Sequence, residues 1–185
     1  MEPGTTEEKN ARSRKKLVLK KPFEKITVKE ITDGAGVIRP TFYNHFSDKY
    51  EVIDWIYMHE GIEPGRALIE TGMAQEYVRF VLARMKNDKE FYLAASKIQG
   101  QNSFENIITN IFQNMFCHYF VIWMNTVTID TKWLTPVRIS KFYVNETVFL
   151  IKEWIDDNMS ESPEEIAKIF SIAGTESFTN ILKLL

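Results

Sequence analysis

Apolar residues recur at helical spacing along most of this chain, and this period limits its fold more than any other feature. The clearest run lies in residues 104–123, where large side chains fall at i, i+3, i+4 and i+7. Only 8 Gly and 6 Pro occur among the 185 residues, too few for the many tight turns of a sheet-rich chain. The sequence therefore predicts an all-α protein of about nine helices.

Residues 27–49, TVKEITDGAGVIRPTFYNHFSDK, predict two short helices joined by a tight turn. Thr27 and Glu30 have the spacing of a capping box, and Gly36 supplies a positive φ for the turn. Pro40 falls in the first turn of the second helix, where its missing N–H is not needed. The two helices would pack through four apolar residues, Val28, Ile31, Val37 and Phe42. This is the helix-turn-helix arrangement, and we call residues 27–49 the reading head.

The second helix of the reading head would turn hydrogen-bonding side chains outward. These side chains are Arg39, Thr41, Tyr43, Asn44 and His45. Such groups can reach base edges and phosphates in a major groove. A structural helical hairpin that never meets DNA is the alternative, but the clustering of hydrogen-bonding types on one helix favours a nucleic-acid contact.

Charge is distributed unevenly along the chain. Residues 1–50 hold 11 Lys and Arg against 7 Asp and Glu, whereas residues 51–185 hold 12 against 18. A basic N-terminal third in a protein of net charge −2 suggests a local anionic partner, such as a phosphate backbone or a membrane surface. A solvated, charged helix face is the other interpretation of the same residues.

The run VKEITDGAGVIRPTFYNHFSDKYEVI resembles the N-terminal DNA-binding domain of the TetR family of bacterial transcriptional regulators. The close match covers residues 22–57, and its T-F-Y-x-H-F-x-x-K core is the specific part. A weaker similarity, from Phe142 to Trp154 and again at residues 162–166, connects the C-terminal part to the branch that includes the activator of dihydroxyacetone kinase operons. The resemblance implies a sequence-specific transcriptional regulator, a repressor or an activator, that binds double-stranded DNA.

The resemblance also implies a contact for nine residues of the reading head. Those expected at phosphate are Thr27, Lys29, Tyr43 and His45. Those expected at base edges are Arg39, Pro40, Thr41 and Asn44. The Pro40 ring would meet a thymine methyl group, and Lys49 would hold the phosphate backbone beside a helix N-terminus.

Three positions depart from the family pattern. The family usually has Ser or Thr where this chain has Ile38, so the second helix loses an N-cap worth about 1 kcal/mol. It usually has Ala in place of Thr32 and a helix former in place of Gly34. The helix predicted over residues 7–21, which precedes the reading head, is also unusually basic. Its extra cations, which are Arg12, Arg14, Lys15 and Lys16, would either contact phosphate or face solvent.

Residues 1–60 are predicted to form the helix-turn-helix DNA-binding domain, and residues 61–185 a helical effector-binding and dimerisation domain. One reading head touches few base pairs, so specific binding calls for two heads on a palindromic operator. We expect the long helices at 137–157 and 163–183 to pair with their symmetry mates in a homodimer. The predicted interface residues are Phe149, Trp154, Ile169, Phe170, Ala173 and Gly174.

Control is expected to come from an effector bound by residues 61–185. Binding would tilt the helix at 48–60 and change the separation of the two heads. Two effectors remain open: a small apolar or aromatic molecule, or a protein co-regulator. A pocket for the first would be lined by Phe112, Phe116, Trp123 and Tyr143. The same aromatic stripe, with Cys117 and His118 in it, is otherwise plain core.

The sequence gives no sign of an enzyme. We find no nucleophile elbow, P-loop or dinucleotide fingerprint, and we expect no cofactor. A single cysteine, Cys117, argues against a disulfide framework and a cysteine-based zinc site, and no His, Asp and Glu set has metal spacing. Without a signal peptide or a membrane-spanning stretch, the chain is expected in the bacterial cytoplasm, at the nucleoid. The competing prediction is a helical ligand-binding or protein-interaction module without DNA binding.

Overall fold

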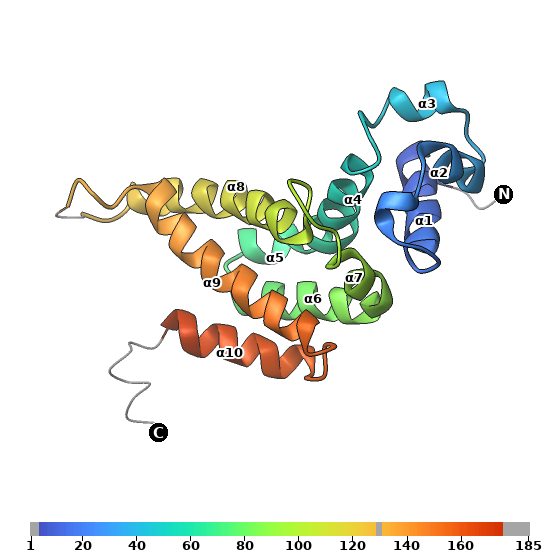
Figure 1. Ribbon diagram of the computed structural model, residues 1–185. Helices are drawn as coiled ribbons and strands as arrows, with labels where there is room; N and C mark the ends of the chain where they lie inside the picture. Colours follow the sequence, from blue (N-terminus) through green and yellow to red (C-terminus); the bar gives the residue numbers. More distant parts are fainter. Residues whose placement is uncertain (1–3, 129–130, 176–185) are drawn as a thin grey trace. The chain divides into compact units, whose positions relative to one another are not determined.

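A computed structural model describes residues 4–128 and 131–175 of the chain. Those residues form helices and connecting turns with no β-strand among them, which confirms the all-α prediction. The chain divides into two compact units, Met1–Phe104 and Glu105–Leu185 (Figure 1). The expected domain boundary at residue 60 stays a prediction. In the described part of the chain, no helix is long and apolar enough to cross a bilayer.

The helices have the following bounds. In the first unit they are α1 (Thr6–Val18), α2 (Val28–Ala35), α3 (Arg39–Tyr43), α4 (Glu51–Ile56), α5 (Arg66–Glu70), α6 (Ala74–Asn87) and α7 (Lys89–Ala95). Two 3-10 turns, η1 (Phe23–Lys25) and η3 (Glu63–Gly65), and the π-helical turn η2 (Tyr57–Ile62) lie between them. Helix α8 (Phe104–Met124) begins at the boundary of the units, and α9 (Pro136–Asp156) and α10 (Pro163–Thr175) follow it.

The first four helices enclose a small apolar core. Helix α1 packs against α2, α3 and α4, and Figure 1 shows the four together at the N-terminal end of the first unit. The side chains buried there are Ala11, Val18, Phe23, Ile26, Ile31, Phe42, Phe46, Val52 and Ile53. This core fixes the orientation of the helix pair at residues 27–49, because each of its helices contributes apolar residues at helical spacing.

The connecting helix expected over residues 48–60 consists of α4 followed directly by η2. Asp48 starts it, since its Oδ1 accepts hydrogen bonds from the backbone N–H groups of Tyr50 (2.6 Å) and Glu51 (3.0 Å). The change to π-helical bonding begins at Tyr57. Such turns inside a longer helix occur frequently at functional sites.

Gly34, one of the departures from the family pattern, is explained by the packing of α1 on α2. A Cβ atom placed on Gly34 would collide with the hydroxyl oxygen of Ser13, whose own Cβ would be 3.4 Å away. The buried Ser13 hydroxyl has no hydrogen-bond partner among the described residues. Close approach of the two helices therefore selects glycine, although alanine is the better helix former.

Gly34→Ala is expected to destabilise the protein by about 1–2 kcal/mol, because the new methyl group overlaps the Ser13 hydroxyl. Ser13→Ala alone should be nearly neutral. The double variant Ser13→Ala/Gly34→Ala should be at least as stable as the parent, since alanine gains up to about 1 kcal/mol over glycine in a helix. Urea unfolding of the four proteins measures the coupling. Simple additivity, with no rescue by Ser13→Ala, would contradict this packing.

The second unit is built on α8, α9 and α10. Thr135 caps α9 by accepting the N–H of Arg138 (3.3 Å), and Ser162 caps α10 by accepting that of Glu165 (3.2 Å). A hydrogen bond from the Gln113 amide to the Ser140 hydroxyl joins α8 and α9. Helices α9 and α10 pack on each other. The last helix begins at Pro163 as predicted, and residues 176–185 of the expected 163–183 helix lie outside the described residues.

Candidate nucleic-acid interface

Helix α2 begins and ends on the local signals that the sequence contains. The Thr27 hydroxyl accepts the N–H of Glu30 (3.3 Å), and the Glu30 carboxylate accepts the N–H of Thr27 (2.9 Å), which completes the capping box. At the other end Gly36 has φ 67° and ψ 34°, in the left-handed region that glycine tolerates best. The N–H of Val37 then donates to the carbonyl of Thr32 (3.0 Å) and closes the turn.

The carboxylate of Glu30, in the first turn of α2, lies beside the ammonium group of Lys21. Lys21 forms an ion pair with Glu30. This bond, with the hydrogen bonds from Thr27, lowers the pKa of Glu30 to about 2. Glu30 is therefore ionised at neutral pH and holds the cap with charge-assisted hydrogen bonds.

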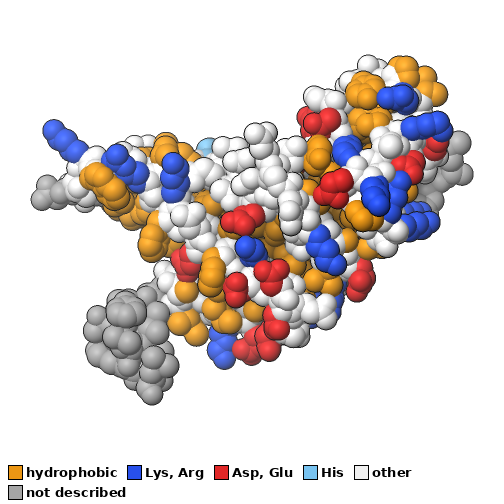
Figure 2. All heavy atoms as spheres, viewed as in Figure 1, with side chains coloured by type: hydrophobic (Ala, Val, Ile, Leu, Met, Phe, Trp, Pro, Cys, Tyr) orange, Lys and Arg blue, Asp and Glu red, His pale blue; other side chains and the backbone are white. Residues whose placement is uncertain are grey.

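Helix α3 is held by aromatic packing beneath it and exposes most of its other side chains to solvent. Phe42 and Phe46 are 0% and 2% exposed, with ring centroids 5.4 Å apart. The exposed residues here are Ile38, Arg39, Pro40, Tyr43, Asn44 and His45, while Thr41 is half-buried. Figure 2 shows hydrophobic side chains gathered over α3 around a basic one. A rigid, exposed helix with mixed donors, acceptors and apolar groups can read a DNA groove.

Comparison with known families decides the identity of this arrangement. The model of bacterial regulatory proteins of the tetR family matches residues 15–55. A model of the C-terminal region of transcriptional regulators, also of the TetR type, matches residues 73–174, more than half of the chain. The chain belongs to the TetR family of transcriptional regulators. The sequence-based identification of the family is thus confirmed, and with it a DNA-binding regulator of transcription.

Solved structures support the fold of this TetR-family protein. The chain is similar to the dihydroxyacetone kinase operon activator DhaS, with a TM-score of 0.60 and 19% sequence identity. The likeness covers 90% of this chain and 92% of that one. At this identity it shows a shared fold. Among curated proteins no match was found.

Several predicted DNA contacts of the TetR reading head already have partners within the protein. Lys29 pairs with Asp33 at 2.6 Å, but both side chains are largely exposed, so this pair is weak and exchangeable. The Nδ1 atom of His45 lies 2.8 Å from the Glu7 carboxylate on α1. The Thr27 hydroxyl belongs to the capping box of α2. Phosphate contacts by these three residues would replace or rearrange internal bonds.

Lys49 has a structural role that the sequence did not reveal. Its ammonium group donates to the carbonyls of Phe23 (3.2 Å), Glu24 (2.9 Å) and Ile26 (3.0 Å). These bonds use all three N–H donors of the side chain. Burial and the charge of Arg14 lower the pKa of Lys49. Lys49 therefore ties α4 to the turn that precedes α2, and a phosphate contact would cost at least one of these bonds.

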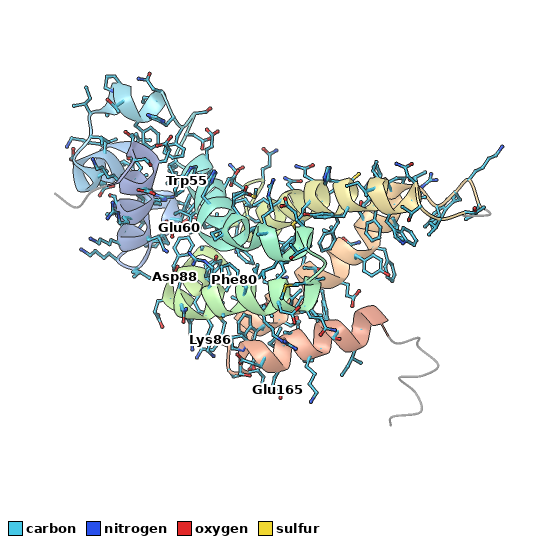
Figure 3. The ribbon with its side chains drawn as sticks, turned by 180° about the vertical axis from the view of Figure 1, so that it is seen from behind. Trp55, Glu60, Phe80, Lys86, Asp88 and Glu165 are labelled. Carbon is cyan, nitrogen blue, oxygen red and sulfur yellow. The ribbon has the colours of Figure 1, made fainter. Side chains whose placement is uncertain are left out.

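Two of the extra cations of α1 neither face solvent nor lie free for phosphate. Lys15 is 18% exposed and forms ion pairs with Glu60 (2.8 Å) of η2 and Asp88 (2.6 Å), at the junction of α6 and α7. Figure 3 shows Glu60 and Asp88 next to each other, toward α1. Burial alone would lower the pKa of Lys15, but hydrogen bonds to both carboxylates raise it. Lys15 thus joins α1 to the connecting helix and to the junction of α6 and α7.

Arg14 is the second such cation, and it lies in the core. The side chain is 0% exposed, and its guanidinium carbon lies 3.6 Å from the centroid of the Phe23 ring. Its Nε and both Nη atoms have no hydrogen-bond partner among the described residues. Burial lowers the pKa of Arg14 to about 9, against weaker opposing effects of Tyr50 and Glu24. The spacing of apolar residues in α1 gave no sign of this burial.

Thr32, another departure from the TetR pattern, fits its position without strain. It is 1% exposed, and its hydroxyl donates to the carbonyl of Lys29 (2.9 Å). The buried hydroxyl is therefore satisfied inside its own helix, as is common for threonine. At Ile38 the structure shows the loss that the sequence predicted, since α3 has no side-chain N-cap bond.

The predicted effector-site residues lie on α8 and α9 of the second unit. Phe112 is 5% exposed and lies 5.8 Å from Phe116, centroid to centroid. Tyr143 stacks on Phe120 at 5.3 Å, and Phe120 meets the exposed Trp123 edge to face at 6.1 Å. The structure thus places these aromatic residues in two neighbouring clusters along the two helices.

The predicted interface residues on α9 and α10 differ in exposure. Phe149 is 60% and Ile169 43% exposed, Ala173 and Gly174 are exposed, and Phe170 is half-buried. Trp154 is the exception, because it is 3% exposed and its indole N–H donates to the carbonyl of Glu161 (3.1 Å). Phe149 and Trp154 are five residues apart, which separates them by about 140° around a helix. Trp154 is therefore an interior residue with no surface to offer a partner.

Proposed function

We propose that this TetR-family protein binds a palindromic operator as a homodimer and that an effector bound by its second unit controls the binding. One observation carries the proposal. The recognition helix α3 exposes Arg39, Tyr43 and Asn44 while Phe42 and Phe46 anchor it from below. A helix whose backbone is held in this way can enter a groove without refolding, so little backbone entropy is lost on binding.

Within this proposal the residues divide by the part of DNA that they touch. Thr27, Lys29, Tyr43, His45 and Lys49 would contact phosphate and set the position of the protein on the duplex. Base edges would be read by Arg39, Pro40, Thr41 and Asn44. Arg39 is the strongest candidate for a guanine, because a guanidinium can bond both O6 and N7.

Exposed aromatic residues on α9 support a homodimer. Phe142 and Phe149 are 67% and 60% exposed and lie seven residues apart, so they share one face of the helix. On α10 Ile169 and Ile172 are 43% and 38% exposed. Pairing these faces with those of a second copy would bury large apolar side chains in a four-helix bundle, which is the expected interface for two reading heads.

The effector would be a small apolar or aromatic molecule held by Phe112, Phe116, Trp123 and Tyr143. In the clusters that these residues form, the exposed Trp123 and the half-buried Tyr143 leave aromatic surface on which such a molecule can stack. A protein co-regulator is the alternative effector.

Control would reach DNA through the connecting helix. The π-helical turn η2 contains Glu60, which Lys15 ties to α1 and thus to the reading head. A shift of η2 would therefore move the head, and the coupling free energy would appear as a change in operator affinity.

The test is fluorescence anisotropy with a duplex selected by the protein from random sequence and with an unrelated duplex. Affinity for both should fall on the order of 10³-fold between 50 and 200 mM salt, as release of counterions from several phosphates requires. Lys29→Ala should weaken both duplexes alike, whereas Asn44→Ala should change the sequence preference. Lys97→Ala, an exposed change in the turn that follows α7, is the control and should bind both duplexes as the wild type does. Binding that is absent at low salt, or independent of salt, would refute the proposal.

A further inference from the structure

Ile38, at the start of α3, is the most exposed large hydrophobic side chain in the described part of the chain, at 69%. It occupies the N-cap position with an extended backbone, φ −86° and ψ 152°, and makes no side-chain cap bond. Two ordinary preferences are therefore broken at one position. The helix lacks a cap worth about 1 kcal/mol, and a large aliphatic group stays in water.

The chemistry around Ile38 suits an apolar contact better than a phosphate contact. Isoleucine has no hydroxyl group to donate, and Pro40, two residues later, has no backbone N–H. The start of α3 therefore presents fewer hydrogen-bond donors than an ordinary helix N-terminus. What it presents instead is the aliphatic side chain of Ile38 next to the exposed Arg39. Figure 2 shows hydrophobic side chains gathered over α3.

In the major groove of DNA the apolar group is the C5 methyl of thymine. We propose that Ile38 determines part of the operator specificity by packing on a thymine methyl group, so that each half-site carries a T·A pair facing the start of α3. This inference rests on the proposed function. It assigns sequence reading to a position whose usual Ser or Thr would cap the helix instead. Positions that break local rules in this way are where function is expected.

The experiment replaces each thymine of the selected duplex in turn with uracil, which removes only the methyl group. For the wild type, uracil at one position of each half-site should weaken binding about fourfold per half-site, the value of one buried methyl group. Ile38→Ser should bind thymine and uracil equally at that position and restore the cap. Its salt dependence should match the wild type, since no charge changes.

Controls separate this inference from the proposed function. Leu19→Ser changes an exposed apolar residue of the first unit outside the reading head, 55% exposed, and should leave the thymine preference intact. Ile38→Val should keep most of the preference for thymine over uracil. One outcome is that the protein binds its selected duplex with the expected salt dependence while Ile38→Ser loses as much affinity as the wild type at every thymine replaced by uracil. That result would overturn this inference alone. Failure to bind any duplex would overturn both.

Discussion

Replacing both Phe142 and Phe149 with glutamate is expected to give a folded monomer that binds a palindromic operator at least about 100-fold more weakly. In a dimer, binding of one reading head holds the other at a high effective concentration near its half-site, and the monomer loses this advantage. The two rings are 67% and 60% exposed, so their loss leaves no cavity in the subunit. In a dimer four such rings would be buried, each contributing about 1.5–3 kcal/mol, and four carboxylates would repel instead. Analytical ultracentrifugation and anisotropy measure the two effects.

The matched control is Lys141→Glu, an exposed position of the same helix next to Phe142. It introduces a carboxylate without removing an aromatic ring and should stay dimeric. Circular dichroism should show the same helix content for all three proteins. A Phe142→Glu/Phe149→Glu protein that remains a dimer, or a wild type that is monomeric at micromolar concentration, would exclude this face of α9 as the interface.

Arg14→Met is expected to stabilise the protein by about 2 kcal/mol, because it removes a buried cation without hydrogen-bond partners. The pKa of Arg14 falls from 12.5 to about 9, so at neutral pH its charge opposes folding. Methionine keeps a straight, flexible side chain over the Phe23 ring, although it loses the cation–π contact. Thermal and urea unfolding at pH 7 measure the gain.

The pH dependence gives an independent check on Arg14. A basic group whose pKa is lower in the folded than in the unfolded protein reduces the free energy of unfolding, and the reduction is complete below the folded pKa. For Arg14 this reduction becomes smaller as pH rises from about 9 toward 12.5. The stability advantage of Arg14→Met should therefore shrink above pH 9. Lys16→Met, an exposed change on the same helix, should be nearly neutral at every pH. A loss of stability in Arg14→Met would show that the guanidinium is bound productively.

Helix positions and the turn of the reading head could be predicted because their signals are local. The Thr27–Glu30 capping box and the turn at Gly36 involve only residues a few positions apart, so their hydrogen-bond partners can be identified from the sequence. The burial of Phe42 followed from the same short-range pattern. The separation of Phe149 from Trp154 around α9 was also available from helical spacing, and the sequence-based interface prediction overlooked it.

The family of the chain and the outward placement of Arg39, Tyr43 and Asn44 could therefore be determined from the sequence alone. Only the tertiary structure decided where three cations of residues 1–50 lie: Arg14 in the core on Phe23, Lys15 on Glu60 and Asp88, and Lys49 on three backbone carbonyls. The physical reason is that a long side chain takes its partner from whichever element packs against it, and those partners lie 9 to 73 residues away along the chain. Helical periodicity describes one helix at a time and has no information about its neighbours.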